Sequence, residues 1–187
     1  IDVIDCGLVP TPTLQLAVEF HEAAGGIVIT ASHNPVEWNA LKFVGSDGLF
    51  LSKEAANRLF EIARDDRIER GAWDTLGEIT TDDFAVQRHL ESVLGLEIVD
   101  FHAIRSRGFK VALDCVRGAG GTIMPALLDR LGCKVAGMDL ETNGRFTRAP
   151  EPVPANLGNL GKLVSTRKAD QGMAVDPNAD RLPGVDG

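Results

Sequence analysis

Two polar segments far apart in the chain contain side chains that can transfer a chemical group and bind a cation. The first, TASHNP, places Ser32 and His33 directly after the apolar run IVIT, and Lys42 follows ten residues after Ser32. The second, DPNADR, follows the apolar run GMAV and has three oxygen-bearing side chains at alternate positions, Asp176, Asn178 and Asp180. A hydroxyl can carry a group in covalent catalysis, and oxygen ligands at this spacing can converge on a hard cation.

Three interpretations of Ser32 follow from its neighbours. The segment from Ser32 to Pro35 has the residue types of a loop that leaves a strand, in which Ser and Asn bond to the nearby backbone. A Ser-His-Asp hydrolase is disfavoured, because adjacent residues rarely align as nucleophile and base and the chain has no Gly-x-Ser-x-Gly segment. Combined with a strand-end acidic triplet, Ser32 instead suggests a serine that carries a phosphoryl group, with a metal neutralising its charge.

The acidic triplet begins like a calcium-binding EF-hand loop but does not continue like one. Its sixth position is Arg181 where such a loop needs Gly, and its twelfth is Gly187 where it needs Glu. Magnesium fits better, because Mg²⁺ needs few protein ligands when a phosphate oxygen or water completes its octahedron. The alternative is an acidic turn in solvent.

A third segment, RGAGG at 117–121, precedes an apolar helical pattern. Its backbone amides could hold an anion at a helix start. The alternative is an ordinary tight turn, since most glycine-rich motif matches have no ligand.

These motifs are expected at the ends of strands in α/β units. Apolar and β-branched runs predict strands at 2–7, 27–30, 109–115, 134–140 and 172–176. Helical periodicity predicts helices near 13–24, 53–66, 81–94, 122–132 and 157–168, with Ser52 capping the second and Asp82 and Asp83 in the first turn of the third. We expect IVIT to be a buried parallel strand completing a βαβ unit, and 41–52 to be a hairpin turned by Ser-Asp-Gly.

The composition is that of an ordinary folded protein with an acidic balance. The 187 residues include 27 acidic and 19 basic side chains, giving a net charge of −8. No basic cluster has the density that binds nucleic acid, and no apolar run reaches the roughly 18 residues that cross a bilayer. Three widely spaced cysteines indicate reduced thiols and a cytoplasmic protein. We therefore expect neither nucleic acid nor membrane as a partner, and the sequence leaves the oligomeric state open.

TASHNP, WNALK and DPNADR, in this order and at this separation, resemble the α-D-phosphohexomutase family of phosphoglucomutases, phosphomannomutases and phosphoglucosamine mutases. The likeness extends to TPT at 11–13, LDCVRGAGG at 113–121 and NGRFTRAPEPVPANL at 143–157. It implies a four-domain α/β enzyme, of which this chain is a fragment formed of two α/β/α layered units with mixed sheets. Residues 1–99 would be the latter part of domain I with the phosphoserine loop, and residues 100–187 domain II with the metal loop; domains III and IV would be absent.

The resemblance also implies roles for individual residues. Ser32 would be the serine phosphorylated in the resting enzyme, with His33 and Lys42 contacting the phosphosugar and assisting proton transfer. Mg²⁺ would be held by a phosphoserine oxygen and three side chains, Asp176, Asn178 and Asp180, and Arg181 would be the cation beside the phosphate. The implied reaction moves a phosphoryl group between the 1- and 6-positions of a hexose phosphate through a hexose bisphosphate.

Two departures from the family pattern have consequences. Asn178 replaces the usual aspartate and removes one negative charge, which predicts weaker Mg²⁺ binding. The family's amino-terminal Gly/Arg motif, sugar-recognition loop and phosphate-binding loop are not among these residues, so we expect no turnover from this chain alone. EWNALK is closest to phosphoglucosamine mutases. The alternatives are a phosphomannomutase or phosphoglucomutase, a non-catalytic sugar-phosphate binding protein on the same fold, and a metal-dependent phosphatase.

Overall fold

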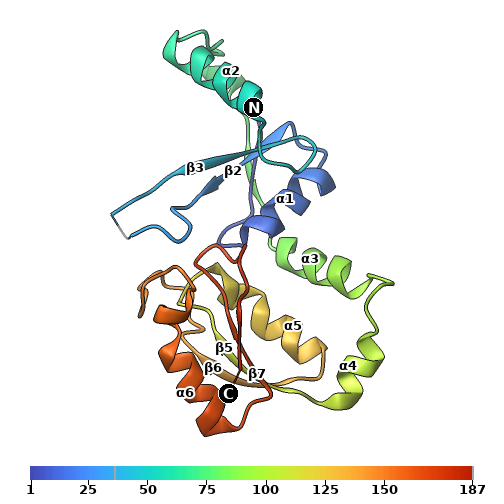
Figure 1. The fold of residues 1–187 in the computed structure, drawn as a ribbon. Coiled ribbons are helices and arrows are strands. Elements are labelled where there is room, and N and C mark those ends of the chain that lie inside the picture. Colours follow the sequence, from blue (N-terminus) through green and yellow to red (C-terminus); the bar gives the residue numbers. More distant parts are fainter. Residues whose placement is uncertain (36, 187) are drawn as a thin grey trace.

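A computed structural model describes residues 1–35 and 37–186, which form two α/β units joined end to end (Figure 1). Gly187, the twelfth position in the EF-hand comparison, lies outside the described residues. Among the residues with a described structure, no helix is long and apolar enough to cross a membrane.

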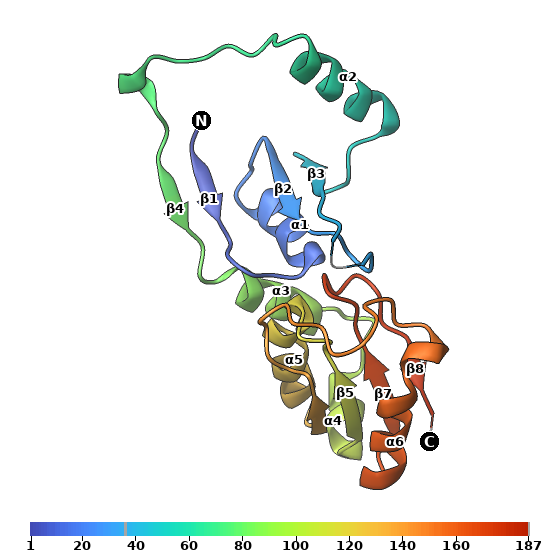
Figure 2. The same ribbon diagram turned by 90° about the vertical axis from the view of Figure 1, so that its left-hand side faces the viewer.

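The described residues of the first unit form two small sheets and two helices. Its elements in chain order are β1 (Val3–Asp5), α1 (Thr11–Phe20), β2 (Gly25–Ile29), β3 (Leu41–Gly45), α2 (Lys53–Arg64), a 3-10 turn (Trp73–Thr75) and β4 (Ile79–Thr81). Strand β1 pairs with β4 in parallel, and β2 pairs with β3 in antiparallel register (Figure 2). Ser52 caps α2 as predicted, accepting a hydrogen bond from the Ala55 amide at 3.2 Å.

The prediction of IVIT as a buried parallel strand is wrong. Strand β2 is antiparallel to β3, and only one of its faces is covered, because Gly26 lies directly against the Val18 side chain of α1. Ile27 and Ile29 on the other face are 55% and 71% exposed. The described residues contain no βαβ unit of β1, α1 and β2, since β1 pairs with β4 instead. A short apolar run does not distinguish a strand buried on both faces from one buried on a single face.

The helix predicted over 81–94 begins later than expected. Thr81 ends β4, and α3 spans Ala85–Leu94. Asp82 therefore lies before the helix and is buried, where it pairs with His21 of α1 and Arg88 of α3. These contacts outweigh the preference of Asp82 for the first helical turn, and they link α1 to α3.

The second unit has a four-stranded sheet with helices on both faces. After α3, its elements are α4 (Phe101–Arg107), β5 (Lys110–Asp114), a 3-10 turn (Ala119–Thr122), α5 (Met124–Arg130), β6 (Lys134–Met138), a 3-10 turn (Pro154–Asn156), α6 (Gly158–Arg167), β7 (Gln171–Ala174) and β8 (Gly184–Val185). The strand order is β6-β5-β7-β8, with only β8 antiparallel. Alternate residues of β5 enter two cores: Leu113 packs with α5, and Ala112 packs with α6. This confirms the α/β/α layers and the mixed sheet.

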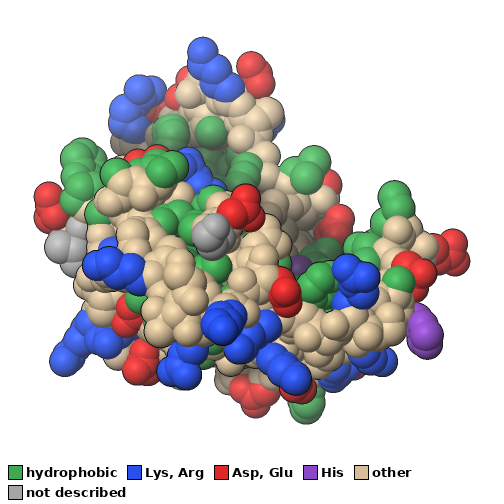
Figure 3. Space-filling view, turned by 60° about the horizontal axis from the view of Figure 1, so that its bottom comes forward, with side chains coloured by type: hydrophobic (Ala, Val, Ile, Leu, Met, Phe, Trp, Pro, Cys, Tyr) green, Lys and Arg blue, Asp and Glu red, His purple; other side chains and the backbone are tan. Residues whose placement is uncertain are grey.

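The two ends of this sheet have different environments. The loops that follow β5 and β7 face the first unit (Figure 1). Basic side chains gather at the opposite end of the molecule (Figure 3), where Lys110, Lys134 and Arg167 line a shallow hollow. The carboxyl ends of the parallel strands, where α/β sheets place their ligands, therefore meet the loop that carries Ser32.

Candidate active site

Ser32 lies in the loop that joins β2 to β3. Its backbone has a φ of 53°, the left-handed region that non-glycine residues adopt rarely. The Ser32 amide donates a hydrogen bond to the Thr30 hydroxyl at 2.9 Å, which holds this turn. Unusual backbone geometry of this kind is common where a side chain must be aimed at a fixed point.

The Ser32 hydroxyl meets the acidic loop of the second unit. Its Oγ lies 2.8 Å from Oδ1 of Asn178 and 3.3 Å from Oδ2 of Asp176. The residues are separated by 146 and 144 positions in the chain, so the fold brings the two predicted segments together. Three oxygens converge here with a single hydroxyl proton among them, an arrangement that favours a positive charge at their centre.

His33 and Lys42 each contact a residue of this site. Nδ1 of His33 is 3.2 Å from the Ser32 hydroxyl. Lys42, on β3, donates from Nζ to Oδ2 of Asp180 at 3.2 Å and lies over the ring of Phe50. The Lys42 side chain is 27% exposed.

The two carboxylates of the acidic loop have different environments. Asp176 is fully buried, and its Oδ1 accepts hydrogen bonds from the amides of Asp180 and Arg181 at 3.0 and 3.2 Å. Burial, together with the nearby charge of Asp180, raises the pKa of Asp176. Burial also acts to raise the pKa of Asp180, but hydrogen bonds from Asn178 and Lys42 outweigh it and lower that pKa. The structure thus pairs Asp180 with Lys42 and turns Asp176 toward Ser32.

Arg181 contributes to the loop through its backbone, while its guanidinium lies elsewhere. Nη1 of Arg181 is 3.3 Å from a carboxylate oxygen of Glu151, and both side chains are about half exposed. Its role as the cation beside a phosphate stays a prediction. Glu151 is a neighbour that sequence reasoning did not identify, because nothing in the run APEPVPANL distinguishes it from a solvent-exposed glutamate.

The donor set suits a divalent cation. Within the described ranges, no three His, Cys, Asp or Glu side chains form a group that could hold a metal ion. The acidic loop is not such a group because its middle residue, Asn178, has an amide in place of a carboxylate. The oxygens of Asp176 and Asn178 nevertheless lie 3.3 and 2.8 Å from Ser32 Oγ. Adjacent ligands of Mg²⁺ at about 2.1 Å are separated by about 3 Å, so these two oxygen–oxygen distances are close to those between neighbouring ligands of such an ion.

The glycine-rich turn at 117–121 supports the acidic loop. Its amides are used internally: Gly118 donates to the carbonyl of Cys115 at 2.8 Å, and Ala119 to that of Pro177 at 2.7 Å. Gly118 also lies so close to the acidic loop that a Cβ there would be 2.5 Å from the Pro177 carbonyl oxygen. The tight-turn interpretation therefore fits, and these two amides are not free to bind an anion.

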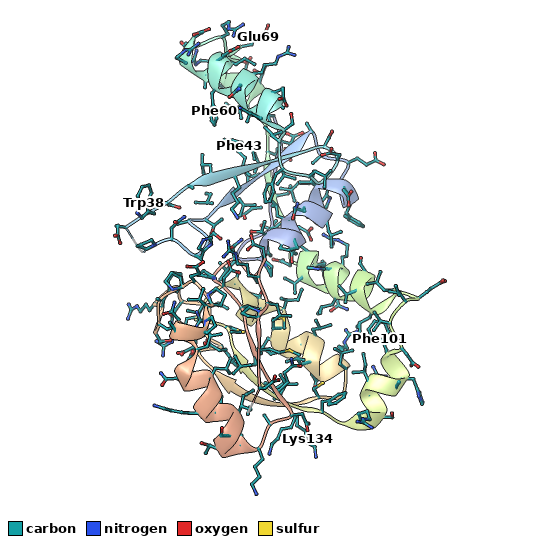
Figure 4. The ribbon with its side chains drawn as sticks, in the orientation of Figure 1. Trp38, Phe43, Phe60, Glu69, Phe101 and Lys134 are labelled. Atoms are coloured by element: carbon teal, nitrogen blue, oxygen red, sulfur yellow. The ribbon has the colours of Figure 1, made fainter. Side chains whose placement is uncertain are left out.

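A cavity of about 250 Å³ opens beside Ser32. One wall comes from the loop between β2 and β3, including Thr30, Ser32 and Trp38, and the other comes from the second unit, including Arg117, Gly118 and Phe146. Figure 4 shows Trp38 at the outer tip of the loop between β2 and β3, and its side chain is 65% exposed. A small ligand in this cavity would contact both units next to the serine hydroxyl.

The fold and site define a class of protein in which a strand-end serine of one α/β unit meets a strand-end acidic loop of the next. The chain matches the sequence models of two protein domain families. Residues 87–187 match phosphoglucomutase/phosphomannomutase alpha/beta/alpha domain II, and residues 1–69 match alpha/beta/alpha domain I of the same proteins. The chain belongs to the phosphoglucomutase/phosphomannomutase family. The boundary at residues 99 and 100 stays a prediction, and the segment around it contains α4, which Asp100 caps.

Curated relatives are similar over nearly the whole chain. The probable phosphoglucosamine mutase of Methanopyrus kandleri is 38% identical over 182 residues, covering 97% of this chain and 39% of the relative. The phosphoglucomutase/phosphomannomutase of Thermococcus kodakarensis is 38% identical over 186 residues, covering 99% and 40%. The chain therefore spans about two fifths of the length of these relatives.

Solved structures agree with this relationship. A phosphoglucomutase/phosphomannomutase family protein from Burkholderia thailandensis superposes with a TM-score of 0.81 at 26% identity, covering all of this chain and 40% of the other. The structure of a protein from Thermus thermophilus described as a phosphomannomutase gives a TM-score of 0.79 at 28% identity, covering 98% of this chain and 41% of the other. The α/β fold predicted from sequence is confirmed. The chain corresponds to about two fifths of each of these longer structures.

Proposed function

We propose that this chain provides the phosphoserine loop and the metal loop of a phosphohexomutase that moves a phosphoryl group between the 1- and 6-positions of a hexose phosphate. Residues 1–99 belong to domain I of that enzyme and residues 100–187 to domain II. The observation that carries the proposal is the approach of Ser32 Oγ to Asn178 and Asp176 at 2.8 and 3.3 Å, across the two units.

Ser32 is the carrier in this mechanism. Its phosphorylated hydroxyl transfers the phosphoryl group to a hydroxyl of the hexose phosphate, which gives a hexose bisphosphate and a free serine. After the bisphosphate reverses its orientation, its other phosphoryl group returns to Ser32 Oγ, and the isomerised hexose phosphate leaves. Phosphoryl transfer needs little covalent participation beyond this, so positioning and charge neutralisation dominate.

The neighbours of Ser32 manage protons and charge. His33 Nδ1, at 3.2 Å from the serine oxygen, is placed to exchange a proton with it. Lys42 brings a positive charge to the edge of the same cluster and is placed to accept or donate the proton of the sugar hydroxyl. The cavity beside Ser32 gives the sugar phosphate a place to bind against both units.

Asp176, Asn178 and Asp180, together with a phosphoserine oxygen, are the residues that would hold Mg²⁺. When bound, the ion would neutralise charge on the phosphoryl group. The buried Asp176 would supply an anchoring carboxylate, and Asn178 would supply a neutral oxygen in place of a carboxylate oxygen. This makes the set less negative than three carboxylates would be.

The substrate is proposed to be a glucosamine phosphate. Support comes from the names of the relatives, several of which are probable phosphoglucosamine mutases. The Thermococcus kodakarensis relative, named phosphoglucomutase/phosphomannomutase, makes glucose and mannose phosphates the alternatives.

The test is an Mg²⁺-dependent assay of the full-length protein with glucosamine, mannose and glucose phosphates, in the presence of the corresponding bisphosphate. We expect interconversion of 1- and 6-phosphates without release of inorganic phosphate, and loss of this activity in Ser32→Ala. Release of free phosphate would identify a phosphatase instead. Tight binding of a sugar phosphate with no isomerisation would indicate a non-catalytic binding protein.

A further inference from the structure

Thr11 is a buried residue of the first unit that contacts the acidic loop of the second. Its side chain is 1% exposed, at the start of α1. The Thr11 hydroxyl accepts a hydrogen bond from Nδ2 of Asn178 at 2.9 Å, and the Thr11 amide donates to the carbonyl of Asn178 at 3.0 Å. Both the side chain and the backbone of Asn178 are therefore held by one residue from the other unit.

The orientation of the Asn178 amide decides whether it can ligate a cation. Only its carbonyl oxygen can do so, because an amide NH₂ group is a hydrogen-bond donor. Nδ2 lies 2.6 Å from a carboxylate oxygen of Asp180, which can only accept, and 2.9 Å from the Thr11 hydroxyl. With Nδ2 fixed by these two acceptors, Oδ1 faces Ser32 at 2.8 Å.

We propose that Thr11 is a positioning residue for the cation site, acting through Asn178 by holding its amide so that the carbonyl oxygen faces Ser32. This rests on the proposed function, in which Asn178 is a ligand. Nδ2 of Asn178 donates to two acceptors, the Asp180 carboxylate and the Thr11 hydroxyl. Asp180 is itself a proposed cation ligand, whereas Thr11 is not, so Thr11 acts on the site only through Asn178. Groups that orient a metal ligand in this way typically contribute about tenfold or more to metal affinity.

Thr13 provides a matched control two residues further along the same helix. It is equally buried, at 1% exposure, but its hydroxyl contacts Nδ1 of His89 in α3 at 2.8 Å, away from the acidic loop. Replacing either threonine by valine keeps the shape of the side chain and removes one hydrogen bond of α1, which is buried at Thr11 and partly buried at Thr13. Both variants should therefore lose a similar amount of thermal stability, and only one should change the cation site.

The experiment measures binding of Mn²⁺ alone to the full-length protein by electron paramagnetic resonance of the free ion, with all variants brought to the same phosphate content on Ser32. We expect Thr11→Val to bind Mn²⁺ about tenfold more weakly than the unaltered protein. Thr11→Ser, which keeps the hydroxyl, should bind as the unaltered protein does, and so should Thr13→Val. Thr11→Ala also lacks the hydroxyl and repeats the test if the valine variant does not fold.

The outcomes separate this inference from the proposed function. Unchanged Mn²⁺ affinity in the variants that lack the Thr11 hydroxyl, or an equal loss in Thr13→Val, would overturn the role of Thr11 alone. Absence of Mn²⁺ binding by the unaltered protein would overturn the cation site and the role of Thr11 together. Weaker binding in Thr11→Val with recovery in Thr11→Ser supports the inference, because a general loss of packing would not depend on the hydroxyl.

Discussion

Gly118→Ala is the substitution whose effect can be worked out most directly from the geometry. A Cβ at this position would lie 2.5 Å from the carbonyl oxygen of Pro177 and 2.6 Å from its Cα. Ordinary contact begins at 3.4 Å, so the acidic loop would have to retreat by about 0.9 Å. The neighbouring atoms belong to the backbone, which leaves no flexible side chain to absorb the displacement.

This displacement would reach the candidate ligands on either side of Pro177. Misplacing catalytic groups by about 1 Å costs about 100-fold in rate. Overpacking of a well-packed site costs about 1–3 kcal/mol of stability. We therefore expect Gly118→Ala in the full-length protein to lower kcat for the mutase reaction by about 100-fold, with a moderate loss of thermal stability.

The assay compares initial rates at saturating substrate and bisphosphate, at a temperature where unfolding curves show every variant folded. Gly158→Ala is the matched control, because a Cβ at Gly158 meets no atom within 4 Å. It should retain the rate of the unaltered protein. A Gly118→Ala variant with an unaltered kcat and unaltered Mn²⁺ affinity would refute the role of the glycine-rich turn as the support of the acidic loop.

Three further substitutions test other parts of the site. Asn178→Asp adds a carboxylate to the donor set and should tighten Mg²⁺ binding by about tenfold in calorimetric titrations; equal or weaker affinity would contradict the assignment of Asn178 as a ligand. Lys42→Met should reduce kcat by about 100-fold or more, through loss of its proton transfer and charge, and an unaltered rate would exclude those roles. Burial acts to raise the pKa of Asp82, but hydrogen bonds from His21 and Arg88 lower it to about 2, from an ordinary value of 3.8. Its carboxylate therefore stabilises the fold above pH 4, and this stabilisation is lost as the pH falls toward 2. Asp82→Asn should lower the free energy of unfolding, measured in urea, by about 2 kcal/mol at pH 6. The effect of the substitution should become progressively smaller below pH 4. A loss independent of pH would contradict the ion pairs.

The sequence allowed the reactive residues of the site to be predicted, but not the contacts that bring them together. Ser32 and the acidic loop could be recognised because each follows an apolar strand and consists of residue types that phosphoryl transfer requires. Their meeting, at 2.8 Å between Ser32 and Asn178, depends on the contact of two units, and no local pattern specifies such a contact. The resemblance of the ordered motifs to a known family supplied that expectation.

The supporting residues were the ones that sequence reasoning missed. Thr11 stands in a TPT segment that was noticed only as part of the resemblance, and its contact with Asn178 spans 167 positions. Gly118 resembles any glycine of a tight turn until its closeness to Pro177 is known. Secondary structure failed where a tertiary contact decided the outcome, as at Asp82, which binds His21 and Arg88 where a helix start was expected.

The proposed mechanism depends on a phosphoryl group carried by Ser32, and the first measurement is the mass of the full-length protein as purified, followed by peptide mapping. We predict a species heavier by one phosphate, with the modification mapped to Ser32, lost in Ser32→Ala and exchanged with labelled hexose bisphosphate. A protein that carries no phosphate on Ser32, even after incubation with that bisphosphate, would contradict the phosphoserine mechanism.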